Sequence, residues 1–340
     1  MNHFDPDAAA RPDSGIFGLP HDAAEARVLL LPVPYDATAS YRAGAAAAPA
    51  AILAASRQVE LFDRQTGHPY RSGIHMRSAD PMIAETSHRA RRLALPIIAK
   101  GGAGKGDEEA VAEVEQAGEA VREHVFAAVS EIFDMGKIPG VVGGDHSVAF
   151  GAIEAVAARH EGIGLLQIDA HADLRPDFEG FRWSHACVMH KVMAELSGVE
   201  RLAQVGVRDM GLVEQEAIEA SAGRIVCNHD LDMQRRLAAG ESFLSLCAEI
   251  IEPLPSNVWI TFDIDGLDPT LCPHTGTPVP GGLSFSQACL LIEALADSGR
   301  RILGFDLCEV VPGPGDEDLD AIVAARVLYK LCGFALKTQS

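Results

Sequence analysis

Short apolar, β-branched runs recur along this chain and alternate with segments of helical periodicity. Such alternation is typical of repeated βαβ units, which build a mostly parallel sheet with helices on both faces. Residues 107–135 repeat apolar side chains every three or four positions behind an acidic first turn, so we predict a long amphipathic helix there. The predicted strands span residues 26–34, 138–144, 163–169, 201–207, 223–229, 257–265 and 301–310.

One domain accounts for the whole pattern. The chain has 340 residues, of which 48% are hydrophobic and 22% charged, so it is long and apolar enough to bury a large core. No internal repeat or Pro/Gly/Ser-rich linker divides it, and we expect an N-terminal extension over 1–25 followed by a single domain over 26–340. The glycine-rich stretch 100–109 lacks the terminal Lys-Ser/Thr pair of a phosphate loop and is expected to be a connector.

The charge and cysteine content limit the partners. With 28 Lys and Arg against 48 Asp and Glu, the net charge is -20, which disfavours nucleic acid and anionic membranes and suits a small cationic substrate. Seven cysteines occur without CxxC or zinc spacing, so we expect free thiols. Because no signal peptide or 18-residue apolar run is present either, we expect a cytoplasmic protein.

Acidic and imidazole side chains follow three of the predicted strands. Ligands of parallel sheets bind at the carboxyl ends of the strands, and residues two apart on an extended chain share a face, so these side chains are expected to converge. The three motifs are "GGDHS" with Asp145 and His146, "DAHAD" with Asp169, His171 and Asp173, and "DIDGLDP" with Asp263, Asp265 and Asp268. A single such motif more often forms a turn or a helix cap, so the interpretation depends on all three together.

Clustered carboxylates raise one another's pKa unless a cation neutralises them. Two divalent ions would balance the four charges of Asp169, Asp173, Asp263 and Asp265, with His146 and His171 adding nitrogen ligands. A set of oxygen and nitrogen ligands without thiolate suits Mn²⁺, with Co²⁺, Ni²⁺, Fe²⁺ or Zn²⁺ as alternatives. Paired metals activate water, so hydrolysis is the expected reaction class.

In this order, "GGDHS", "DAHADLR", "SHACVM", "DIDGLDP", "TGTPVPGGLS" and "EVVP" resemble the ureohydrolase family of arginases and agmatinases. The resemblance runs from about residue 27 to residue 335. It implies an α/β fold, a three-layer αβα sandwich around a mostly parallel eight-stranded sheet, and two Mn²⁺ per subunit. It also implies hydrolysis of a guanidino group to urea and an amine, and a homo-oligomer, trimer or hexamer.

The resemblance also implies roles for individual residues. One metal would be held by His146, Asp169, Asp173 and Asp263, and the other by Asp169, His171, Asp263 and Asp265. Asp173 would relay a proton to the leaving amine, His185 would exchange protons with bulk water, and Glu309 would pair with the guanidinium. Asp145 and Asp268 are expected to orient ligands or to cap turns.

The sequence is compatible with several substrates. The segment "DLRPDFEGFRWSHACVM" resembles agmatinases, which favours agmatine with putrescine and urea as products. Asp177 or Glu179 could pair with the amine of agmatine, and His274 beside Cys272 is a candidate for the substrate wall, whereas His190 is expected to be a packing or surface residue. Arg175 favours a carboxylate tail unless Asp177 or Glu179 neutralises it. The alternatives are guanidinobutyrate, guanidinopropionate, formimidoylglutamate, arginine, guanidine, or a metal-binding relative without turnover.

Overall fold

A single sheet of eight strands forms the centre of the computed structural model, which describes residues 4–315 and 317–339. Neighbouring strands are all parallel, in the order β2-β1-β3-β8-β7-β4-β5-β6. The predicted fold class is confirmed. The strands are β1 (Val28–Val33), β2 (Ile74–Met76), β3 (Ile138–Gly143), β4 (Ile163–Ile168), β5 (Val199–Val205), β6 (Ile225–Asn228), β7 (Asn257–Asp263) and β8 (Arg301–Cys308).

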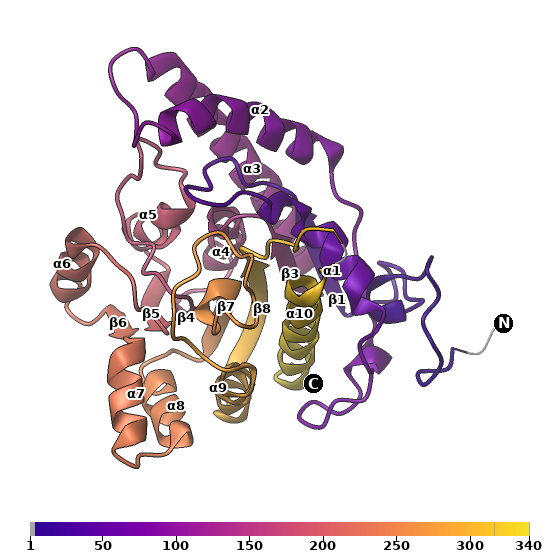
Figure 1. The fold of residues 1–340 in the computed structure, drawn as a ribbon. Coiled ribbons are helices and arrows are strands. Elements are labelled where there is room, and N and C mark those ends of the chain that lie inside the picture. The colour runs from indigo at the N-terminus through magenta and orange to yellow at the C-terminus, as the bar shows by residue number, and fades with distance from the viewer. Residues whose placement is uncertain (1–3, 316, 340) are drawn as a thin grey trace.

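Helices cover both faces of this sheet (Figure 1). One core packs α1, α8, α9 and α10 against the sheet, and the core on the opposite face packs α2, α3, α4 and α5. The helices are α1 (Ala48–Ser56), α2 (Pro81–Ile98), α3 (Glu108–Asp134), α4 (Ala149–Ala157), α5 (Val188–Glu195), α6 (Leu212–Ala220), α7 (Asp230–Ala238), α8 (Phe243–Ile251), α9 (Phe285–Asp297) and α10 (Leu319–Lys337).

The predicted long helix is confirmed as α3. Its buried side chains return every three or four residues, among them Val114, Val121 and Val125, because this spacing keeps them on the face toward α2 and α4. The glycine-rich stretch before it connects α2 to α3 and ends in the first residues of that helix. Within the described residues, no helix is both long enough and apolar enough to cross a lipid bilayer.

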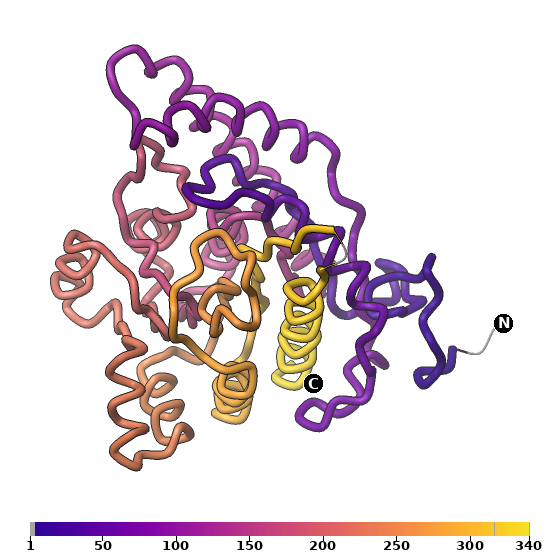
Figure 2. The backbone as a smooth tube through the Cα atoms, in the orientation of Figure 1, coloured from indigo at the N-terminus to yellow at the C-terminus, as the bar shows by residue number. Residues whose placement is uncertain are grey.

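The segment before β1 packs against the rest of the molecule. Figure 2 shows this indigo segment beside the part of the chain that forms α1, and its buried residues belong to the core that contains α1 and α10. Ile16 and Phe17 are buried there, the backbone N–H of Phe17 donates to Ser56 Oγ at 2.9 Å, and its ring meets that of Tyr329 edge-on at 4.8 Å. Residues 1–3 of the expected extension lie outside the described residues.

Candidate metal centre

The loops after β3, β4, β7 and β8 meet at the carboxyl edge of the sheet. After β3, Gly144 passes so close to Tyr35 that an added Cβ would lie 1.7 Å from the Tyr35 carbonyl oxygen, so only glycine fits. Asp145 then accepts the backbone N–H of Ser147 at 3.1 Å and caps the short 3₁₀ helix η4 (His146–Val148). The imidazole of His146, the first residue of η4, lies at the ends of β4 and β7, where it contacts Asp169 and Thr261.

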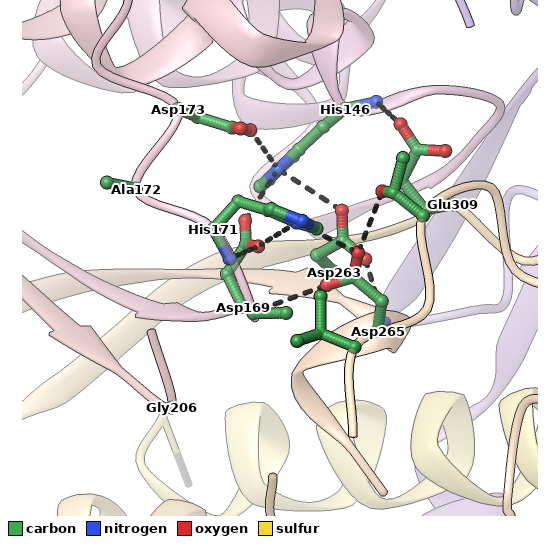
Figure 3. A network of polar contacts seen from close by, with 12 residues as sticks. His146, Asp169, His171, Ala172, Asp173, Gly206, Asp263, Asp265 and Glu309 are labelled. Carbon is green, nitrogen blue, oxygen red and sulfur yellow. Dashed lines mark hydrogen bonds and ion pairs between the residues drawn. The ribbon is translucent and has the colours of Figure 1, made fainter. Parts of the chain in front are cut away.

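The first group of potential ligands surrounds Nδ1 of His146 (Figure 3). This atom lies 2.9 Å from Asp173 Oδ2, 3.1 Å from Asp169 Oδ2 and 3.6 Å from Asp263 Oδ2. His146 and the three carboxylates are all buried. These residues come from three separate strand ends, and the structure brings them to one point.

The second group shares Asp169 with the first. Nδ1 of His171 lies 3.1 Å from Asp265 Oδ2 and 3.6 Å from Asp169 Oδ1, and the ligand atoms of this trio are within 4.8 Å of one another. Backbone donors hold the carboxylates in place, since the N–H groups of Ala170 and Asp265 donate to Asp265 Oδ1 and Asp263 Oδ1 at 3.0 and 2.8 Å. All six residues predicted as ligands therefore lie in one cluster.

Burial and like charge perturb the pKa values of this cluster. Burial and the charge of Asp169 raise the pKa of Asp173 to about 6, and burial with the charges of Asp265 and Asp169 raises that of Asp263 well above its usual range. Burial lowers the pKa of His171, but the charge of Asp265 and a hydrogen bond to Asp169 outweigh it and raise that pKa to about 12. The buried carboxylates thus crowd negative charge that a cation would neutralise.

The donor set fits a pair of divalent ions. It combines four carboxylates with two imidazoles, and Asp169 belongs to both groups of ligand atoms, as a shared ligand requires. Carboxylate and imidazole ligands without thiolate suit Mn²⁺ and its neighbours in the first transition row. In both groups, the imidazole atom that faces the carboxylates is Nδ1.

His185 and Glu309 lie next to the cluster. Glu309 follows β8, and its Oε1 accepts the backbone N–H of His146 at 2.9 Å and lies 3.4 Å from His185 Nδ1. Nε2 of His185 is 3.1 Å from Ser40 Oγ. Burial lowers the pKa of His185, but the hydrogen bond and charge of Glu309 raise it to about 9. Within the described residues, Oε2 of Glu309 accepts no hydrogen bond, but Glu309 is buried and is not among the residues that line the neighbouring cavity.

A cavity of about 180 Å³ opens onto the cluster. Some of its lining residues were predicted as site residues, but Asp209 and Glu214 were not. Both follow the carboxyl end of β5, so the rule that ligands bind at the carboxyl ends of parallel strands could have identified them. Asp209 is exposed, and within the described residues its carboxylate has no hydrogen-bond or ion-pair partner. The lining residues are Ser40, His171, Asp173, Arg175, Phe178, His185, Ala186, Asp209, Met210, Glu214, Asp263 and Thr277.

Arg175 forms an ion pair with Glu214, not with Asp177 or Glu179. Its Nε lies 3.6 Å from Glu214 Oε2, and its guanidinium stacks over the Phe178 ring with 4.8 Å to the centroid. Glu214 also accepts the backbone N–H groups of Leu174 at 3.0 Å and Gly211 at 2.7 Å. The lining of the cavity includes neither Asp177 nor Glu179.

Three residues near the site, His274, Asp268 and His190, have hydrogen-bond or ion-pair partners outside the metal cluster or through the backbone. His274 lies outside the cavity lining, because its Nδ1 pairs with Asp320 Oδ2 at 2.8 Å at the start of α10. Asp268 accepts hydrogen bonds from both the backbone N–H and the hydroxyl of Thr270, so it caps a turn, which is one of the two roles expected for it. The backbone N–H of His190 donates to the carbonyl of Asp173 at 3.0 Å.

Known proteins share these features. The family model described as "Arginase family" matches residues 26–333. The N(1)-aminopropylagmatine ureohydrolase of Thermus thermophilus is 34% identical over 91% of this chain and 90% of its own length, and the agmatinase of Bacillus anthracis is 27% identical over 90% and 91%. The crystal structure of agmatine ureohydrolase of Thermoplasma volcanium superposes with a TM-score of 0.72 at 25% identity, over 95% of this chain and 94% of that one. The chain therefore belongs to the arginase family and is a hydrolase of guanidino compounds.

Proposed function

We propose that this enzyme uses two Mn²⁺ to hydrolyse guanidinoalkylamines, with agmatine as substrate and putrescine and urea as products. The observation that carries this proposal is the charge distribution at the outer end of the cavity. The carboxylate of Asp209 is free there, whereas the guanidinium of Arg175 is already neutralised. A substrate that ends in an ammonium group fits this arrangement better than one that ends in a carboxylate.

The pairing of Arg175 removes the argument for an acidic substrate tail. Glu214 is buried and accepts two backbone N–H groups, so it is held beside Arg175 whether or not a ligand is present. Binding a carboxylate to Arg175 would place it next to Glu214, and like charges at such a distance repel. Asp209 carries no such compensation and supplies the anion that an alkylammonium requires.

The proposed roles of the inner residues follow from their positions. Divalent ions held by the two groups of ligands would lower the pKa of water and so supply the nucleophile for hydrolysis. Oε2 of Glu309 would accept hydrogen bonds from the substrate guanidinium, while Oε1 stays bound to the backbone of His146. Asp173 lines the cavity and would carry a proton to the leaving amine, and His185 would exchange that proton with solvent through the cavity.

A panel of substrates tests the proposal. Manganese-loaded enzyme is assayed for urea, formamide and ammonia with agmatine, N(1)-aminopropylagmatine, guanidinobutyrate, guanidinopropionate, formimidoylglutamate, arginine and guanidine. The aminopropyl compound is included because the Thermus thermophilus relative is named for it and because it adds a second cation to the tail. We expect the highest kcat/KM for agmatine or its aminopropyl derivative, whereas a preference for a guanidino acid would contradict the proposal.

The Asp209→Asn variant tests the tail contact itself. It should raise the KM for agmatine by roughly two- to fivefold, because an ion pair with an exposed carboxylate contributes up to about 1 kcal/mol. It should change the KM for guanidinobutyrate little or lower it. Asp177→Asn is the matched control, since Asp177 is exposed and lies outside the cavity lining. Equal effects of the two substitutions on agmatine would contradict the role of Asp209.

Two further parts of the proposal concern the state of the protein in the cell. All seven cysteines are free, which supports a reducing compartment such as the cytoplasm. A homo-oligomer is proposed as trimer or hexamer, and light scattering should then give three or six times the chain mass of 36.1 kDa. A mass equal to one chain at micromolar concentration would contradict the oligomer.

A further inference from the structure

A row of buried polar side chains crosses the sheet beneath the metal centre. Gln204 on β5, Gln167 on β4, Thr261 on β7 and Asp306 on β8 are all fully buried. They are direct partners in the sheet register, Gln204 with Gln167, Gln167 with Thr261, and Thr261 with Asp306. Because burying a polar group is unfavourable unless it is hydrogen-bonded, four such groups in register require a reason.

The row lies two residues before the proposed ligands along two strands. Gln167 precedes Asp169, and Thr261 precedes Asp263, so each pair shares a face of the sheet. On this face β4 changes from Ile163 and Leu165 to Gln167. The same change occurs along β7, where Trp259 precedes Thr261. The polar row therefore separates the apolar core from the carboxylates.

One branch of the row ends on His146. Nε2 of His146 lies 2.8 Å from Thr261 Oγ1, and the hydroxyl of Thr261 donates to Asp306 Oδ1 at 2.9 Å. A hydroxyl group has only one proton, and Thr261 donates this proton to Asp306. The Thr261 oxygen must therefore accept a hydrogen bond from Nε2–H of His146. This direction leaves Nδ1, the atom that faces Asp169 and Asp173, as the nitrogen that can bind a metal.

The other branch ends on Asp169. The side-chain amide of Gln167 donates to Asp169 Oδ2 at 2.8 Å and accepts from Gln204 Nε2 at 2.7 Å. Gln204 Nε2 also donates to the carbonyl of Ala172, in the loop between His171 and Asp173, at 2.7 Å. The rotamer of Asp169, the residue common to both ligand groups, is thus set from beneath the site.

We propose that this polar row positions the metal ligands. Thr261 and Asp306 hold His146 in the tautomer with Nε2–H, and Gln167 and Gln204 orient the carboxylate of Asp169. The inference rests on the metal centre of the proposed function and is independent of the substrate. A purely structural alternative exists for Asp306, because it also accepts the indole N–H of Trp259 at 2.7 Å.

Manganese affinity of metal-stripped protein, measured by calorimetry, tests the proposal. Thr261→Val keeps the shape of the side chain and removes its hydroxyl, and Gln167→Met removes the donor to Asp169. Loss of a residue that orients a metal ligand lowers metal affinity by roughly 10- to 100-fold, and we expect this for both variants. Thr261→Ser should restore affinity to within a few-fold of the parent enzyme.

The control separates positioning from general stability. Ser56→Ala removes a buried hydroxyl that accepts the N–H of Phe17 in the core on the other face, and it should lower the melting temperature of the metal-free chain without changing Mn²⁺ affinity. If Thr261→Val and Gln167→Met behave like this control, the row is only structural and the inference is wrong.

Two outcomes remain informative if one variant does not fold. Circular dichroism identifies a variant that does not fold. The Mn²⁺ affinity of the other variant then decides whether the polar row positions the ligands. Absence of urea from every substrate would overturn the proposed function, but it leaves the affinity measurement valid. Failure of the two proposals is therefore distinguishable.

Discussion

Asp173 and Glu309 occupy the left-handed backbone region, with φ of 53° and 62°. This region is unfavourable for residues with a Cβ, and it persists where neighbouring contacts hold it. The carbonyl of Asp173 accepts the N–H of His190, and the N–H of Glu309 donates to the carbonyl of Gly144 at 2.8 Å. His190 therefore supports the site through its backbone, which is a role that its side-chain type does not reveal.

Substitution of His185 should separate proton exchange from metal binding. His185 lines the cavity and contacts Ser40 and Glu309 rather than the six proposed ligands. His185→Ala should lower kcat by 10²- to 10⁴-fold, as loss of a proton-transferring group does, while two Mn²⁺ remain bound. Elemental analysis beside urea kinetics measures both, and loss of metal from this variant would contradict the assigned role.

Metal binding should release protons. Nδ1 of His171 must lose its proton to bind a metal, and the pKa of that group is raised to about 12, so Mn²⁺ competes with a bound proton throughout the neutral range. Affinity should therefore rise about tenfold per pH unit for each proton released. Below pH 6 it should fall more steeply, because the pKa of Asp173 is raised to about 6 and this carboxyl also becomes protonated there.

Calorimetry in buffers of different ionisation enthalpy measures these protons between pH 6 and 8. A heat of binding that is the same in all buffers would show that no proton is released. That result would contradict the protonated state of His171 in the metal-free chain.

At the scale of single elements, seven strands were predicted to within two residues at each end. Most of their apolar runs are followed by glycine or acidic residues, which mark strand ends clearly. β2 was missed because it spans only Ile74–Met76 at the edge of the sheet, too short for an alternating pattern to be recognised. The metal ligands depend on none of its residues.

The connection from β3 to η4 should be intolerant of any side chain at Gly144. The added methyl of Gly144→Ala would overlap the carbonyl of Tyr35, so the backbone before His146 must move. We expect a loss of about 3 kcal/mol or more in stability and weaker Mn²⁺ binding. Gly104→Ala is the control, since its Cβ would meet nothing closer than Asp107 Oδ2 at 3.9 Å. Equal melting temperatures for the two variants would contradict this account.

At the scale of the whole molecule, the cluster of buried like charges should make stability depend on metal. Burial and neighbouring carboxylates raise the pKa values of Asp173 and Asp263, so keeping these groups ionised at neutral pH costs folding free energy until a cation is bound. A ligand at 100 times its Kd stabilises the folded state by about 2.7 kcal/mol, so EDTA should lower the melting temperature by several degrees. Asp169→Asn should abolish this response, because Asp169 belongs to both ligand groups.

Calorimetric scans with Mn²⁺ and with EDTA test this dependence. Melting temperatures that agree in both conditions for the parent protein would contradict a stabilising metal pair. A shift of the same size in Asp169→Asn would place the responsible cation elsewhere in the molecule.

The sequence by itself determined seven of the eight strands, the long helix α3 and the residues that gather at the candidate metal centre. These follow from local rules, because parallel strands end at one edge and residues two apart point the same way. Only the tertiary structure decided the partner of Arg175, the position of Asp209 in the cavity, the pairing of His274 with Asp320 and the polar row under the ligands. Each of these joins segments that are far apart in sequence, and the choice among competing partners depends on how helices and loops pack, which no local pattern encodes.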